Sequence, residues 1–130
     1  MTRSFVVRAV GLAALTAVVA ACQSGASPAN APSPDPAVVI AITPGGASPR
    51  TITVKAGSQV TFTNNDTIAH QMYSDPHPEH TDCPEFDSVG YLAPGESRQT
   101  GNLNIVRTCG FHDHIHFENA SLKGSIVIQP

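Results

Sequence analysis

Residues 51–66 read TITVKAGSQVTFTNND, and this stretch indicates the class of fold. From Thr51 to Val54, polar and apolar side chains alternate, which is the pattern of a strand with one buried face. The segment from Lys55 to Ser58 contains a glycine and predicts a turn, and the alternation then resumes from Gln59 to Thr63. The polar residues from Asn64 to Asp66 predict the next turn. Two short strands separated by such turns indicate an all-β domain.

Short β-rich runs separated by glycine and proline continue in both directions along the chain. No segment combines helical periodicity with capping residues over a useful length. About seven to eight short strands at regular spacing predict an antiparallel Greek-key β-sandwich or barrel. The expected strands lie at residues 38–42, 51–54, 59–63, 68–73, 89–92, 97–101 and 124–128.

The N-terminal part of the chain differs in composition from the rest. Residues 1–21 hold two arginines and then an apolar run, which is shorter than the ~20 residues of a membrane-spanning helix. This pattern predicts a secretory signal peptide. Residues 22–36 read CQSGASPANAPSPDP and are too polar and too rich in proline to bury a core, so we expect a tether. The expected domain occupies residues 37–130.

The charge of the chain bears on its partners. From Cys22 onward it keeps five basic and ten acidic residues, a formal charge of −5 with neutral histidines. An acidic domain with few aromatic residues and no basic cluster argues against nucleic acid as a partner. The same charge is compatible with binding cations.

Residues 107–128 read RTCGFHDHIHFENASLKGSIVI and concentrate side chains that bind transition metals. Imidazole and thiolate ligands select copper, zinc and iron rather than magnesium or calcium. Because residues i and i+2 of an extended chain point the same way, His112, His114 and His116 would share one side and Asp113 would face the other. We expect a metal site in a loop between two closing strands. The alternative is a polar loop whose histidines are solvated.

A second histidine-bearing segment, DPHPEHTD, occupies residues 75–82 and contains His77 and His80. Its histidines and carboxylates have spacings that a metal ion could use. The segment could extend the site formed by residues 107–128, form a second and weaker site, or be a solvated rim.

Residues 51–70, TITVKAGSQVTFTNNDTIAH, resemble the cupredoxin pattern. In that family a strand, a glycine turn and a second strand lead to an Asn-rich corner and the first copper-binding histidine. His70 matches that histidine. The segments YLAPGES at 91–97 and LKGSIVI at 122–128 resemble the turn before the penultimate strands and the closing strand of the same family. The resemblance covers residues 37–130 and implies a cupredoxin fold with one copper ion.

The chain also departs from the blue-copper pattern of cysteine, histidine and methionine. Leu122 stands where the axial methionine is expected, and counting back from the closing strand places Asp113 near the usual thiolate position. The stretch FHDHI then resembles a cupredoxin-like branch with His-Asp-His and no ligand cysteine. On that alignment Cys83 and Cys109 are extra, which implies a disulfide between them. The alternative is a type 1 site made by His70, Cys109 and His112.

The sequence Val19-Ala20-Ala21-Cys22 resembles the end of a bacterial lipoprotein signal, in which the cysteine is lipidated and becomes the mature N-terminus. This resemblance implies that the protein is exported and anchored through Cys22 on the periplasmic or other extracytoplasmic face of a membrane. The compartment to which such a protein is exported is oxidising, which is compatible with a disulfide.

We therefore expect a copper-binding, cupredoxin-like lipoprotein of the cell envelope, in a redox or copper-handling role and not an enzyme. Its partners would be the membrane, through Cys22, and a redox or copper-transfer protein, and we expect a monomer. The alternatives are a blue-copper electron-transfer protein using Cys109 and a metal-free β-sandwich that binds other envelope proteins. The expected copper ligands are His70, His112 and His114, with His116, Asp113 and Cys109 as further candidates.

Overall fold

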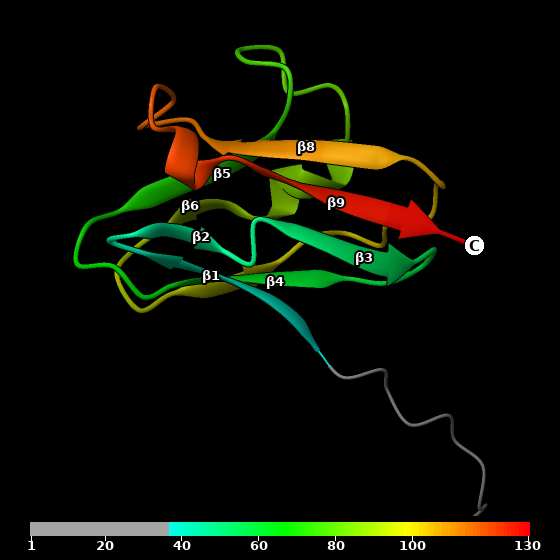
Figure 1. Cartoon of the computed structure of the whole chain (residues 1–130), viewed down its shortest axis with the longest axis horizontal. Helices are drawn as coiled ribbons and strands as arrows, with labels where there is room; N and C mark the ends of the chain where they lie inside the picture. Colours follow the sequence, from blue (N-terminus) through cyan, green and yellow to red (C-terminus); the bar gives the residue numbers. More distant parts are fainter. Residues whose placement is uncertain (1–36) are drawn as a thin grey trace, which may run out of the picture. The chain divides into compact units, whose positions relative to one another are not determined.

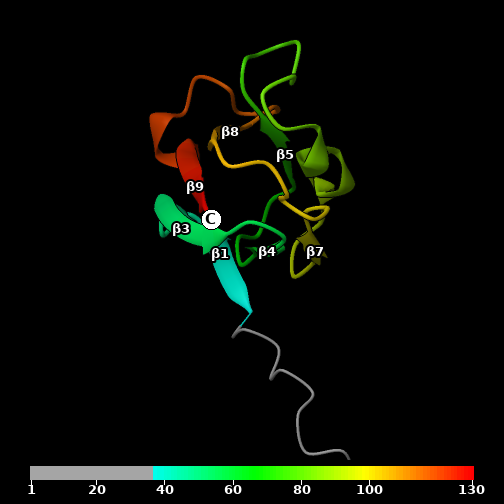
Figure 2. The same cartoon turned by 90° about the vertical axis from the view of Figure 1, so that its right-hand side faces the viewer.

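The computed structural model describes residues 37–130, which form two β-sheets packed face to face (Figure 1, Figure 2). The four-stranded sheet has the strand order β2-β1-β4-β7 and the five-stranded sheet the order β3-β9-β8-β5-β6. Two short 3-10 helices, η1 (Pro84–Ser88) and η2 (Ala120–Leu122), lie in the connections. The strands are β1 (Val38–Thr43), β2 (Gly46–Ser48), β3 (Thr51–Lys55), β4 (Val60–Asn64), β5 (His70–Ser74), β6 (Gly90–Leu92), β7 (Ser97–Gln99), β8 (Thr108–Asp113) and β9 (Gly124–Gln129).

Aromatic side chains hold the two sheets together. Phe62 of β4 and Phe111 of β8 come from different sheets, and their ring centroids lie 5.3 Å apart at an interplanar angle of 84°. Phe86 of η1 meets Phe62 edge to face at 5.5 Å. Such edge-to-face pairs contribute beyond the area that they bury. All three rings are fully buried, and Phe62 and Phe111 therefore mark the inner faces of their two sheets.

The predicted all-β sandwich is confirmed, with nine strands instead of seven or eight. Both sheets are mixed, because β1 pairs in parallel with β4 and β3 pairs in parallel with β9. The turn after β3 therefore carries the chain from one sheet to the other and does not close a hairpin. Parallel pairing requires such a crossover, whereas neighbouring antiparallel strands can be joined by a tight turn.

Strand β8 was expected to be loop, and the structure extends it between β5 and β9. It pairs antiparallel with both neighbours, in the register Tyr73↔His112 and Cys109↔Ile126. The sequence TCGFHD has little intrinsic β-propensity, so pairing on both edges determines its conformation. Side chains at 109, 111 and 113 face inward, and those at 110 and 112 face outward.

The predicted disulfide is confirmed: Cys83 is bonded to Cys109, with a Cα–Cα distance of 5.8 Å and both residues fully buried. It joins the end of the loop after β5 to the start of β8. The loop itself, residues 75–82, lies above β8 on the side away from β1 and β4 (Figure 1, Figure 2). The backbone N–H of Asp75 donates to Gly110 O at 3.1 Å, and that of Asp82 donates to Asp75 O at 2.8 Å.

The signal peptide and tether expected at residues 1–36, with the lipidated Cys22, lie outside the described residues. Across residues 37–130 no helix has the length and apolar character needed to cross a membrane.

Candidate metal centre

Strand β8 contributes to two separate groups of side chains that could bind a metal ion, one on each of its faces. The inner group consists of His70, Asp113 and His116. The imidazole cluster consists of His77, His80, His112 and His114. Within each group the potential ligand atoms lie within 4.8 Å of one another.

The inner group is organised around the carboxylate of Asp113. Its Oδ2 lies 2.7 Å from Nδ1 of His70 and 2.7 Å from Nδ1 of His116. Its Oδ1 accepts hydrogen bonds from the backbone N–H of Gln71 at 3.1 Å and of Ile115 at 3.0 Å. Asp113 is fully buried and His70 is 1% exposed, whereas His116 lies at the surface of the group.

These contacts determine the charge of Asp113. Burial opposes its ionisation, but the hydrogen bonds from His70, His116 and the two backbone N–H groups together hold the pKa of this carboxyl below its ordinary value. Asp113 therefore keeps its negative charge at neutral pH, beside two imidazole nitrogens. A fixed carboxylate with two nitrogen donors is a ligand set suited to a divalent cation.

An asparagine corner positions His70. The Nδ2 amide of Asn64, at the end of β4, donates to the carbonyls of Ile68 at 2.8 Å and Leu92 at 3.0 Å. Its Oδ1 accepts from the backbone N–H of Asp66 at 2.8 Å. Asp66 in turn places Oδ2 3.3 Å from Nε2 of His70. The turn that the sequence predicts at residues 64–66 thus orients the histidine ring through a second carboxylate.

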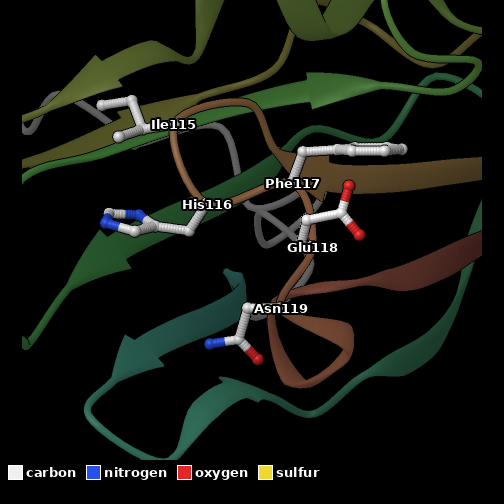
Figure 3. A pocket seen from close by; sticks show the side chains of 5 residues that line it. All are labelled: Ile115, His116, Phe117, Glu118 and Asn119. Atoms are coloured by element: carbon white, nitrogen blue, oxygen red, sulfur yellow. The ribbon is translucent and has the colours of Figure 1, made fainter.

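His116 reaches the inner group because the chain turns after β8. Residues 115–118 form a turn that lines a pocket with Asn119, and Figure 3 shows the rings of His116 and Phe117 pointing away from each other. Nδ1 of His116 contacts the Asp113 carboxylate, whereas the Phe117 ring stacks on that of His77 with centroids 4.0 Å apart. The turn therefore contributes one residue to each side of β8.

The imidazole cluster lies on the outer face of the five-stranded sheet, beneath the loop of residues 75–82. His112 comes from β8 and His114 follows it, while His77 and His80 come from the loop. Nε2 of His80 lies 3.2 Å from Nδ1 of His114. Ring centroids of the His77–His114 and His80–His114 pairs are both 4.9 Å apart, and His80 and His112 are separated by 5.2 Å.

A carboxylate holds His112 in place. Oδ1 of Asp75 lies 2.7 Å from Nδ1 of His112, whose side chain is fully buried. Asp75 can sit there because residue 110 is a glycine: a Cβ on Gly110 would collide with the Asp75 carboxylate. On the far side of the ring, Nε2 of His112 is buried without a hydrogen-bond partner, and so is Nδ1 of His77.

The histidines expected to share one copper site are thus divided by the structure. His112 and His114 do share one face with Asp113 on the other, as the alternation along an extended chain predicts. His70, however, lies on the inner side with Asp113, so it does not meet His112 or His114. His116 leaves the outer side, because the strand ends at Asp113 and alternation stops there. His77 and His80 join His112 and His114 in one group. From sequence, their segment could have extended the site of residues 107–128, formed a second site or been a solvated rim.

The disulfide settles the role of Cys109 among the candidate ligands. A sulfur bonded to Cys83 is not a thiolate, so the type 1 alternative built on Cys109 is contradicted. Leu122, at the position of the expected methionine, is buried and offers no ligand atom. Asp66 was predicted only as a turn residue and Asp75 only as one of the carboxylates of residues 75–82, not as the groups that orient His70 and His112. The only signal was their place beside histidine-bearing segments.

A two-sheet β-sandwich of this topology, with histidines gathered at the ends of β5 and β8, is the architecture of a cupredoxin. The chain is 32% identical over 84 residues to plastocyanin of Scenedesmus fuscus, an alignment that spans 62% of this chain and 84% of that protein. It is 32% identical over 84 residues to chloroplastic plastocyanin of Tetradesmus obliquus, covering 62% of this chain and 57% of that one. The chain therefore belongs to the cupredoxin superfamily.

Solved structures agree on the fold. A purple cupredoxin from Nitrosopumilus maritimus superimposes with a TM-score of 0.55 at 17% identity, covering 71% of this chain and 99% of that one. A Cu(I) form of an amicyanin mutant gives a TM-score of 0.55 at 16% identity, covering 72% and 82%. No protein-family model matches the chain.

Proposed function

We propose that the protein binds copper at the inner group, through Nδ1 of His70, Nδ1 of His116 and the Asp113 carboxylate, in a redox or copper-handling role. The observation that carries this proposal is the convergence of these three side chains within 4.8 Å. His70 matches the first copper-binding histidine of the cupredoxin pattern, and Asp113 stands near the position of the usual thiolate.

The donor set fits a Cu(II) ion. Imidazole nitrogen is a good ligand for copper, and divalent affinity in the first-row series peaks at copper. If Nδ1 of His70 binds the ion, Nε2–H remains free to donate to Asp66 at 3.3 Å, which is the usual support of a ligating histidine. The Asp113 carboxylate, now shared by two imidazoles, supplies the negative charge that compensates the cation.

The bound ion would supply a one-electron Cu(II)/Cu(I) couple, or serve as cargo for transfer. Asp113 in place of a thiolate removes the sulfur ligand that defines a blue-copper centre. We therefore expect a pale Cu(II) complex with two nitrogen ligands and no intense blue band. This supports copper handling, or electron transfer at a histidine–carboxylate centre, over the blue-copper alternative.

The role is that of an exported binding protein. The buried disulfide is typical of an oxidising compartment, and the signal-like residues 1–21 ending at Cys22 support export with lipid anchoring. In this proposal the membrane is one partner, through Cys22, and a copper-transfer or redox protein is the other. The protein acts as a monomer and catalyses no reaction of its own.

The test is an electron paramagnetic resonance titration of the purified protein with Cu(II), together with Asp113→Asn and His116→Gln. We expect a saturable signal from two nitrogen ligands. Both variants should weaken its binding tenfold or more, about 1.4 kcal/mol. Removing the disulfide in a Cys83→Ala/Cys109→Ala variant should leave this signal unchanged, since neither sulfur is a ligand.

Three outcomes would contradict the proposal. An intense blue band lost with Cys109 would restore the type 1 site. The absence of any two-nitrogen copper signal that both inner-group variants weaken would move the binding elsewhere. No saturable binding at all would leave the metal-free interaction domain as the function.

A further inference from the structure

The imidazole cluster lies on the opposite side of β8 from the inner group and is not used by the proposed function. Its four members come from two segments more than thirty residues apart: the loop with His77 and His80, and β8 with its following residue. The disulfide and the backbone hydrogen bonds of Asp75 and Asp82 fix this loop over the sheet. The convergence is therefore produced by the fold and not by neighbours in sequence.

The histidines from the loop are held between aromatic rings. His80 stacks on Tyr73 of β5, with centroids 4.4 Å apart and an interplanar angle of 19°. His77 stacks on Phe117, at 4.0 Å and 21°. Nζ of Lys123 lies 3.9 Å above the Phe117 ring. These contacts hold the two rings before any ligand arrives, which reduces the ordering cost of binding one.

The backbone at His80 adopts a conformation that L-residues seldom take. Its φ is +55°, in the left-handed region, and its N–H donates to the carbonyl of Pro76 at 2.7 Å. Backbone conformations of this kind persist where surrounding contacts enforce them, and they concentrate at binding sites. Here the turn delivers the His80 ring beside His114.

Two buried nitrogens of the cluster lack a partner. His112 is fully buried, and its Nδ1 is matched to the Asp75 carboxylate, so in the neutral ring the proton lies on Nδ1 and Nε2 carries a lone pair. That Nε2 and Nδ1 of His77 have no hydrogen-bond partner. Buried polar atoms are nearly always satisfied, so each exception requires an explanation. Histidines that served only to pack would not leave two ring nitrogens unpaired among the other imidazoles.

We propose that the imidazole cluster is a second metal site, in which His77, His80, His112 and His114 bind one divalent copper or zinc ion through four nitrogens. No carboxylate belongs to the set, which disfavours magnesium and calcium. Nitrogens about 2.0–2.1 Å from one ion lie at most on the order of 4 Å apart, so the observed limit of 4.8 Å requires only a small contraction.

The electrostatics of the cluster suit metal binding. Burial lowers the pKa of both His77 and His80, and the neighbouring imidazoles of His112 and His114 lower it further. Neutral imidazole is the form that binds a metal ion. A metal-ligating histidine usually donates its other ring N–H to a carboxylate, and Asp75 accepts from Nδ1 of His112 in this way.

The experiment is a calorimetric titration of the purified, metal-free protein with Zn(II) and, separately, with Cu(II). It compares the wild type with His77→Gln/His80→Gln and with His116→Gln, which belongs to the inner group. Glu79→Gln is the matched control, because it lies between the two loop histidines and outside the cluster. We expect two ions per wild-type chain, with the second lost or weakened at least tenfold in the double variant and unchanged by Glu79→Gln.

The two sites fail in distinguishable ways. If the double variant binds metal as the wild type does, and only His116→Gln loses an ion, the cluster is a packed histidine stack and the inference is overturned. If only the double variant loses an ion, the second site stands and the inner-group copper site does not. X-ray absorption of the Zn(II)-loaded His116→Gln protein gives an independent reading. Four nitrogen neighbours would support the site, and mainly oxygen neighbours would overturn it.

Discussion

Gly110 is the residue whose missing side chain lets Asp75 approach β8. Any Cβ there would occupy the place of the Asp75 carboxylate, which holds Nδ1 of His112 at 2.7 Å. At the scale of single residues, each of the two candidate groups has such a carboxylate behind a histidine: Asp75 for His112 and Asp66 for His70. Partners of this kind orient the ring and select its tautomer.

The substitution Gly110→Ala should therefore weaken metal binding at the imidazole cluster without touching a ligand. We expect about a tenfold loss of Zn(II) affinity there, the lower end of what loss of a supporting partner costs. Binding at the inner group should not change. Gly45→Ala is the matched control, since a Cβ at Gly45 meets only Thr43 Oγ1 at an ordinary distance of 3.6 Å. Equal affinity of the Gly110→Ala and Gly45→Ala proteins in calorimetry would show that Asp75 has no such role.

At the scale of elements, the loop of residues 75–82 and strand β8 form one unit, joined by Cys83–Cys109 and by the His77 and His80 rings over His112. The loop carries two histidines whose pKa lies below the ordinary value. The folded domain therefore takes up protons on them less readily than the unfolded chain does.

This difference makes the metal-free domain less stable as the pH falls. The contribution of His77 and His80 is fully present above their unfolded-state pKa, near 6.5, and is lost as the pH falls from there towards the lower folded-state values. In urea unfolding with a chelator present, we expect the free energy of unfolding to drop between about pH 7.5 and 5.5. The His77→Gln/His80→Gln variant should show a shallower drop, and an unaltered slope in that variant would contradict the assignment.

Several elements were predictable from sequence because their local pattern and their tertiary role agree. β3 and β4 alternate as half-buried strands do, and the structure places both within a residue of the expected bounds. β8 was not predictable as a strand, because its propensity is weak and its pairing partners are distant in sequence. The inner group was predicted only in part, with His70 as an expected ligand and His116 and Asp113 as further candidates, because only the pairing of β5 with β8 brings His70 against Asp113.

At the scale of the whole molecule, residues 37–130 make a compact two-sheet domain with candidate metal ligands on both faces of one sheet. The all-β class and the Cys83–Cys109 bond follow from the sequence and its family resemblance. The parallel pairing of β1 with β4 and of β3 with β9 does not, since it depends on which distant strands meet. The proposed anchor at Cys22 lies beyond the described part of the chain and rests on sequence alone.

That anchor has a direct test. In cells, Cys22→Ser should move the protein from the membrane fraction to the soluble fraction, because the acyl chains that hold it would have no attachment point. Fractionation and immunoblotting of wild type and variant would measure the change. A Cys22→Ser protein that stays with the membrane would mean that something other than a lipid on Cys22 retains it.

The pairing register of strand β8 decides which of its side chains lie on each face of the sheet. His112 and His114 point one way and Asp113 the other only in the pairing Tyr73↔His112, and a slip of one residue would exchange the two sets. The disulfide between Cys83 and Cys109 holds that register near the start of the strand. Deleting one residue between Cys109 and His112 would therefore displace the side chains of both groups at once, whereas a substitution such as Gly110→Ala alters one position and leaves the register intact.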